Sequence, residues 1–246
     1  MFSVFRNVLQ TWQTEEIVRP TILLTEQNMS NIITEQLTAA GRRIEHDSFA
    51  IVDAEAGAHD YPAEEWQVVR RMIHATADFE FNGLTRFHPS AIEAGVAAIR
   101  NGAPLVADVE MICVGLSQPR LKHFGVKAHH FIADVDVISE AREQNSTRAV
   151  QAMRKAQTLG LLDGGIIAVG NAPTALLEIV RMIKQENLKP ALIVGMPVGF
   201  VSAAESKSAT AELVETPWII TSGRKGGSTL VVAAIHALLA LAEASR

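Results

Sequence analysis

The chain has 246 residues, of which 48% are hydrophobic, 5% aromatic and 20% charged, and its formal net charge is −5 at pH 7. This is an ordinary globular composition, and the acidic balance provides no basic field that would hold nucleic acid. The single cysteine, Cys113, excludes an intramolecular disulfide and a multi-cysteine metal site, and no apolar run approaches the ~20 residues that span a bilayer. We therefore expect a cytoplasmic protein with neither nucleic acid nor a membrane as its partner.

Residues 1–35 have no clear periodic pattern of apolar side chains and are predicted to form a leader, with Met29 as an alternative start. Charged residues such as Arg6 and Glu15 stand where a signal peptide would need an apolar core. Residues 36–246 contain no internal repeat and no linker, so they are predicted to form one domain.

Helices are predicted at Glu35–Arg42 and Ser48–Glu55, and then at Ala63–Thr76 and Ser90–Arg100. A proline opens each of the last two helices, which is the position that proline prefers.

Five short apolar runs, rich in β-branched residues, predict strands that are buried on both faces. Amphipathic segments of helix length separate most of these runs, and such an alternation of strands and helices is typical of βαβ units. The sequence therefore predicts a three-layer α/β/α fold with a mainly parallel five-stranded sheet. The predicted strands are Leu105–Val109, His129–Val135, Gly165–Val169, Ala191–Gly195 and Trp218–Ser222.

Three Gly-rich segments, 169–174, 195–200 and 222–228, each connect a predicted strand to a helix. Glycine lets a ligand approach the backbone, and the free N–H groups of a helix N-terminus favour carboxylate or phosphate. A single such loop is usually only a connection. Three of them at the carboxyl edge of one sheet, one with Arg224 and Lys225, favour an anion-binding crevice. Neither the P-loop pattern nor the dinucleotide-binding pattern is present.

Two sets of titratable residues have competing interpretations. His74 lies near the end of a predicted helix, one turn after Arg70 and Arg71, and spacing alone favours an ordinary surface histidine over a catalytic one. Asp108 and Glu110 are expected to project from the same face at the end of the first predicted strand. A structural role, capping a helix or holding an arginine, is favoured for them over an acid–base pair.

A further helix start is predicted after the fourth strand, where Ser202 and Glu205 have the spacing of a capping box.

Several strings resemble the precorrin-8X methylmutase family, and they occur in the family's order from about Glu45 to Ala242. The string Gly-Met-Pro-Val-Gly-Phe with its Glu-Ser-Lys tail is highly specific. The strings are Asp47–Val52, Arg71–Ala75, Asn101–Met111, Gly170–Leu176, Gly195–Lys207 and Gly223–Ser228.

The resemblance implies a flavodoxin-like α/β/α fold, a homodimer, and a place in cobalamin biosynthesis. The implied reaction moves a methyl group between neighbouring ring C carbons of precorrin-8X or of its cobalt-containing counterpart. It consumes no cofactor and needs no protein-bound metal. The alternative is a tetrapyrrole carrier that binds a corrinoid without chemistry. A titratable group beside ring C speaks against a carrier, since a carrier needs none.

The resemblance also implies the site, and it reverses the interpretation of His74, which becomes the catalytic residue and general acid. The substrate is a large macrocycle rimmed by carboxylates, so local cations are needed to hold it. Lys207 and Lys225 are additional candidates for that rim. The implied substrate-binding residues are Ser48, Ser117, Thr147, Arg148, Asn171 and Arg224.

Overall fold

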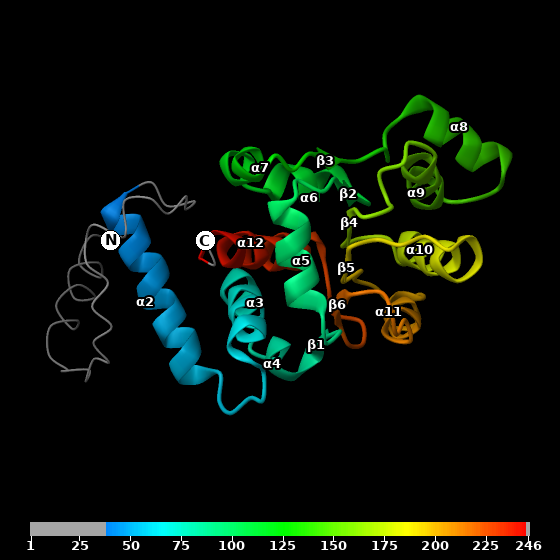
Figure 1. Ribbon diagram of the computed structural model, residues 1–246. Coiled ribbons are helices and arrows are strands. Elements are labelled where there is room, and N and C mark those ends of the chain that lie inside the picture. Colours follow the sequence, from blue (N-terminus) through cyan, green and yellow to red (C-terminus); the bar gives the residue numbers. More distant parts are fainter. Residues whose placement is uncertain (1–37, 245–246) are drawn as a thin grey trace, which may run out of the picture. The chain divides into compact units, whose positions relative to one another are not determined.

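A computed structural model describes residues 38–244 of the chain, so the predicted leader lies outside the described residues (Figure 1). A six-stranded sheet lies at the centre, in the order β1-β6-β5-β4-β2-β3. Five strands are parallel, and β1 pairs with β6 in the antiparallel direction. The strands are β1 (Thr85–Phe87), β2 (Leu105–Ala107), β3 (Ala128–His129), β4 (Ile166–Val169), β5 (Leu192–Gly195) and β6 (Trp218–Thr221).

The sheet has one strand more than predicted. The additional strand, β1, is antiparallel to its neighbour, so the sheet is mixed rather than entirely parallel. The five predicted strands are all present, but each is shorter than expected. The largest difference is at His129–Val135, of which only the first residue belongs to β3. Counted along the chain, the five parallel strands lie in the order 2-1-3-4-5, which is one of the orders of doubly wound sheets.

Helices connect these strands. The predicted helix Ala63–Thr76 has the bounds of α3. The predicted helices Glu35–Arg42 and Ser48–Glu55 are not separate, because one continuous helix, α2, runs from Ala39 to Glu55; residues 35–37 lie outside the described residues. The helices are α2 (Ala39–Glu55), α3 (Ala63–Thr76), α4 (Phe81–Leu84), α5 (Ala91–Arg100), α6 (Glu110–Gly115), α7 (Gln118–Phe124), α8 (Val135–Glu143), α9 (Arg148–Thr158), α10 (Pro173–Glu186), α11 (Ala203–Ala211) and α12 (Ser228–Ala244).

Alternate residues of each central strand pack into two separate cores. In β4, Ile166 and Ala168 pack into the core that contains α3, α5 and α12, whereas Ile167 and Val169 pack into the core that contains α9 and α10. Successive side chains of a strand point to opposite faces, so a strand that is apolar throughout fits a sheet with helices on both sides. Figure 1 shows α3, α5 and α12 on one side of the sheet and α9, α10 and α11 on the other.

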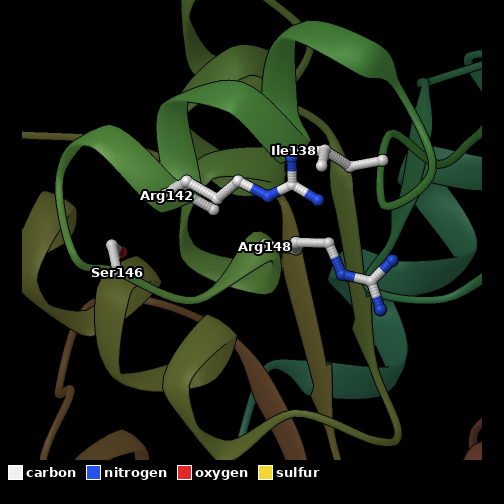
Figure 2. Close-up of a pocket in the computed structure, with 5 residues that line it drawn as sticks. Ile138, Arg142, Ser146 and Arg148 are labelled. Atoms are coloured by element: carbon white, nitrogen blue, oxygen red, sulfur yellow. The ribbon is translucent and has the colours of Figure 1, made fainter.

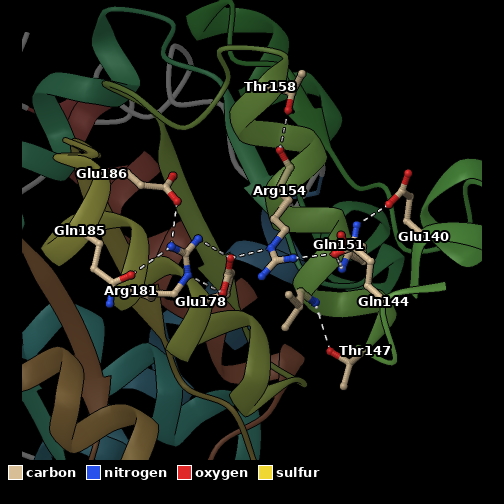
Figure 3. Close-up of polar contacts among 11 residues, drawn as sticks. Glu140, Gln144, Thr147, Gln151, Arg154, Thr158, Glu178, Arg181, Gln185 and Glu186 are labelled. Atoms are coloured by element: carbon tan, nitrogen blue, oxygen red, sulfur yellow. Dashed lines mark hydrogen bonds and ion pairs between the residues drawn. The ribbon is translucent and has the colours of Figure 1, made fainter. Parts of the chain in front are cut away.

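A buried ion-pair network joins α9 to α10. The carboxylate of Glu178, only 7% exposed, accepts from Arg154 Nε at 2.8 Å and from Arg181 Nη2 at 2.7 Å. Figure 3 shows the two arginines reaching Glu178 from opposite sides. Burial alone would raise the pKa of Glu178, but the two guanidinium groups hold it below its usual value of 4.5. This network fixes α9, which Thr147 caps and Arg148 begins, against α10.

Replacing Glu178 with Gln is expected to destabilise the fold by about 2–3 kcal/mol, because two guanidinium groups lose their buried counter-charge. The melting temperature at neutral pH should fall by roughly 5–10 °C. Because the pKa of Glu178 is lowered by folding, its contribution exists above about pH 4.5 and is lost as the pH falls through the folded value. The difference in melting temperature between wild type and Glu178→Gln should therefore shrink in acid.

Glu186→Gln is the matched control, since Glu186 pairs with Arg181 at 2.8 Å but is 44% exposed. We expect a change of at most about 1 kcal/mol for this surface pair. A difference for Glu178→Gln that persists undiminished in acid would contradict the assignment to the ion pairs.

Candidate active site

A buried carboxylate organises the carboxyl edge of the sheet at the point where the strand order reverses, between β2 and β4. Asp108, which follows β2 and is fully buried, accepts three backbone N–H groups from the loop after β4. Gly170 N–H donates to Oδ1 at 3.0 Å, and Asn171 and Ala172 donate to Oδ2 at 2.9 and 2.6 Å. Burial raises the pKa of the Asp108 carboxyl, and these three donors hold that rise back.

This contact corrects the prediction that segment 169–174 binds an anionic ligand. The N–H groups that would receive the ligand are already satisfied by Asp108, which confirms the structural role favoured for this residue. The expectation that Asp108 and Glu110 share a face is wrong, because β2 ends at Ala107 and Glu110 is the first residue of α6. The Glu110 side chain is 66% exposed, and its Oε1 lies 4.0 Å from Nε2 of His130.

The loops after β5 and β6 pack against one another. Gly227 N–H donates to Met196 O at 2.8 Å, and Gly199 N–H donates to Arg224 O at 3.2 Å. A Cβ atom on Gly226 would lie 2.2 Å from Met196 O, so only glycine permits this approach. The sequence signal that singled out these Gly-rich segments therefore reflects how closely the two loops pack.

These two loops expose an aromatic ring and a guanidinium group together. Phe200 is 84% exposed, and Arg224 Cζ lies 5.5 Å from the centre of its ring. Such a pair combines an apolar surface with a cation. The capping box predicted at Ser202 and Glu205 is wrong: Ser202 has a φ of 59°, and its side chain makes no capping bond.

His74 lies in the last turn of α3 with its side chain exposed. Its ring centre is 5.0 Å from that of Phe49 in α2, and the guanidinium carbon of Arg70 lies 4.6 Å from the same Phe49 ring. Ser48 is the neighbouring residue on α2, and its hydroxyl donates to Ile44 O at 2.7 Å. The structure thus places the predicted catalytic histidine and one predicted binding residue on adjacent helices. Sequence reasoning missed Phe49, although it lies inside a string that carries the resemblance.

Two ion pairs fasten α2 to α3 beside His74. Arg70 Nη1 lies 2.8 Å from Asp53 Oδ2, and Arg71 Nη1 lies 3.2 Å from Glu45 Oε1. The residues Glu45, Phe49 and Asp53 are four apart, so they lie on one face of α2. From this spacing, the sequence could have shown which face of α2 packs against α3.

The end of α3 is also tied to the loop that carries Arg224. Lys225 Nζ lies 2.5 Å from Asp78 Oδ2 and 3.0 Å from Glu80 Oε2, just beyond the end of α3. The ammonium group of Lys225 is therefore engaged in ion pairs within the protein. The prediction that it binds a carboxylate of the substrate is wrong. Arg224 is exposed and has no acidic partner among residues 38–244.

Thr147 and Arg148 begin α9 close to the loop after β4. Thr147 Oγ1 accepts from Val150 N–H at 3.2 Å and lies 3.0 Å from Thr174 Oγ1 at the start of α10. Asn171, whose side chain is exposed, stands three residues before Thr174. The structure therefore brings three of the predicted binding residues to one corner of the sheet edge.

Arg148 lines a surface pocket of about 390 Å³ between α8 and α9 (Figure 2). The other lining residues are Ile138, Ala141, Arg142 and Ser146. Ser117 is placed differently, because its backbone N–H donates to His236 Nε2 of α12 at 3.0 Å. Its carbonyl accepts from Leu121 N–H of α7 at 3.0 Å, so these polar contacts include none of the other predicted site residues.

No set of three metal-ligating side chains comes together within residues 38–244. None of the helices in this described part is long and apolar enough to cross a membrane.

Comparisons with known proteins match this chain along most of its length. A family model described as precorrin-8X methylmutase matches residues 43–241. The chain belongs to the precorrin-8X methylmutase family. The cobalt-precorrin-8 methylmutase of Leptospira interrogans is 54% identical over 85% of this chain and 97% of its own length. The corresponding protein of Priestia megaterium is 49% identical over 84% and 91%.

A solved structure of precorrin-8X methyl mutase from Thermus thermophilus gives a TM-score of 0.78 at 53% identity. It covers 83% of this chain and 97% of that one. This methylmutase is accordingly an isomerase of cobalamin biosynthesis, and a carrier without chemistry is not needed to explain the fold or the site.

Asp108→Asn should destabilise the methylmutase by about 2–3 kcal/mol, because the amide group turns a donor toward backbone N–H groups that then lack an acceptor. Thermal melting should show a fall of roughly 5–10 °C. Asp163→Asn is the control, since Asp163 is exposed and accepts one N–H, from Lys189 at 2.9 Å. Equal losses in the two variants would refute the organising role of Asp108.

Proposed function

We propose that this methylmutase moves a methyl group between neighbouring ring C carbons and that cobalt-precorrin-8, the cobalt-containing form, is its preferred substrate. The observation that carries this is the family match over residues 43–241. The cobalt form is favoured by the curated relatives, since three named cobalt-precorrin-8 methylmutase are 54%, 49% and 43% identical and two named precorrin-8X methylmutase are 38% identical. The solved Thermus thermophilus protein, at 53% identity, carries the precorrin-8X name, so the metal-free form stays the alternative that the experiment below tests.

We propose His74 as the general acid of this reaction. Its imidazole is exposed at the end of α3 and is packed against Phe49, so it can meet a ligand while its position stays defined. With the metal-free substrate it protonates the ring nitrogen beside the migrating methyl, which draws electrons toward the donor carbon; with the cobalt form, whose ring nitrogens are bound to the metal, it donates its proton to the conjugated ring system instead. The proton returns to His74 once the methyl has moved, so the reaction has no net proton change. Holding the macrocycle in one reactive form supplies the remaining acceleration.

The proposed binding residues divide by the chemistry they offer. Arg148 and Arg224 are exposed cations that form no ion pair within residues 38–244, so each is available to a substrate carboxylate. Thr147, which directly precedes Arg148, and Asn171, three residues before the Thr174 that Thr147 contacts, offer neutral polar groups. Ser48, near His74, and Ser117, beside α12, are the remaining proposed contacts, which for both rest on the resemblance.

We further propose that residues 36–246 act as one cytoplasmic domain, that the five parallel strands form a flavodoxin-like unit extended by β1, and that the chain is a homodimer. A second copy would cover apolar side chains that are unusually exposed for a monomer. Those above 80% exposure are Val135, Phe200, Val201 and Val214.

The substrate proposal is tested by incubating the purified chain with cobalt-precorrin-8 and, separately, with metal-free precorrin-8X, while recording visible spectra. The conjugated product should form from both, with kcat/KM at least about tenfold higher for the cobalt form, a difference of about 1.4 kcal/mol. Equal or reversed preference would refute the cobalt assignment. Binding without spectral conversion of either compound would refute the isomerase.

His74→Ala should remain folded, because the side chain is exposed, yet lose at least about a hundredfold in kcat, the usual scale of general acid catalysis. His46→Ala is the control, since that histidine is 82% exposed on α2 and its Nδ1 lies 3.5 Å from Asp47 Oδ1. Stopped-flow spectra and melting curves of both variants provide the measurement. Near-native turnover in His74→Ala would remove His74 from the mechanism.

A further inference from the structure

Lys207 in α11 is the largest fully buried side chain among the described residues, with 1% of its surface exposed. Its ammonium donates to the backbone carbonyl of Lys225 at 2.7 Å and to Thr221 Oγ1 at 3.3 Å. It forms no ion pair within the described part of the chain. An ammonium removed from water without a counter-charge is costly to the fold, and burial lowers the pKa of Lys207 to about 8.

The carbonyl that Lys207 holds belongs to the loop after β6. Thr221 Oγ1 donates to the same carbonyl at 2.8 Å, so Lys225 O accepts two side-chain donors. The side chain of Lys225 is fastened in turn to Asp78 and Glu80. Residue 225 is therefore fixed through its carbonyl from the α11 side and through its ammonium from the end of α3.

Arg224, which directly precedes this fixed residue, is free to meet a ligand. Its own carbonyl accepts from Gly199 N–H at 3.2 Å, and its guanidinium lies over the exposed ring of Phe200. Of the two cations in this loop, Lys225 pairs with Asp78 and Glu80, whereas Arg224 is exposed and forms no ion pair within residues 38–244. A buried lysine that holds the next carbonyl along the chain thus controls where Arg224 stands.

We propose that Lys207 is a positioning residue: its buried ammonium holds the 222–227 loop against the 196–202 loop, so that Arg224, lying on Phe200, meets a carboxylate of the substrate. Lys207 touches no substrate itself and acts only through Arg224. The inference rests on the proposed role of Arg224 in binding. This role would explain why a buried ammonium, which lowers the stability of the fold, stands where an apolar side chain of similar length would pack.

The first test replaces Lys207 with Met, which keeps the length of the side chain but removes its donors. KM for the corrin substrate should rise roughly tenfold, the worth of a misplaced charged hydrogen bond, while kcat stays within about twofold of wild type. Thr210→Val is the matched control. Thr210 is buried in α11 and its hydroxyl donates to Ser206 O at 2.9 Å, but it does not reach the loop. An unchanged KM in folded Lys207→Met, or an equal rise in Thr210→Val, would overturn the proposal.

The second test is a double-mutant cycle with Arg224→Ala. If Lys207 acts through Arg224, adding Lys207→Met to Arg224→Ala should change KM by less than about twofold, because the residue to be positioned is already gone. Independent, multiplying effects would overturn the proposal. If Lys207→Met does not fold, Thr221→Val removes the other donor to Lys225 O and enters the same cycle.

Affinity for the reaction product, titrated by absorbance, provides the same cycle without turnover. A chain that isomerised neither substrate would refute the proposed function and still leave the coupling between Lys207 and Arg224 measurable. A wild type that turns over, with Lys207→Met indistinguishable from it, would refute the positioning role alone.

Discussion

The three hydrogen bonds from the loop after β4 to the carboxylate of Asp108 are the constraint on which the carboxyl edge of the sheet depends. They fix the start of α10 on one side of the sheet. The same loop also packs against the other side, since a Cβ atom on Gly170 would lie 2.7 Å from Ser228 Cα at the start of α12. One buried acidic group thus sets the spacing of both helical layers at the edge where the candidate site lies. Thr147, hydrogen-bonded to Thr174 of α10, takes its position from this arrangement.

The contacts divide the cationic side chains into those bound within the protein and those exposed to a ligand. Lys207, Lys225 and Arg154 are committed within the protein, to a carbonyl group or to carboxylates. Arg148 and Arg224 stand exposed without acidic partners among the described residues. Because the net charge of the chain is −5, an anionic ligand gains nothing from the overall field and depends on the few cations left free. Under the proposed role of Lys207, one of the bound cations fixes the backbone beside a free one, Arg224.

The sequence predicted the central strands well, because residues buried on both faces of a sheet must be apolar throughout, and Ile166–Val169 shows this pattern directly. It missed β1, since three residues with one exposed arginine carry no periodic signal and depend on pairing with β6. Lys207 could not be recognised as buried, because Glu-Ser-Lys-Ser reads as an exposed polar turn of a helix, and only tertiary packing decides otherwise. The prediction of a capping box at Ser202 is wrong because Ser202 has a left-handed backbone, whereas a capping residue ordinarily has an extended one. The predicted site residues came from the resemblance, whereas the contacts that position them, such as Phe49 against His74, required the structure.

The two edges of the sheet have a consequence for assembly. The edge strands β1 and β3 are three and two residues long, so each presents very few unpaired backbone groups along its outer side. Short edge strands are a common protection against uncontrolled sheet extension, in which strands of different molecules add to one another. Molecules of this protein are thus poor templates for one another's strands, which disfavours fibrous aggregation. Within residues 38–244, a stable association would therefore use helices and loops, where side chains rather than backbone groups decide which surfaces match.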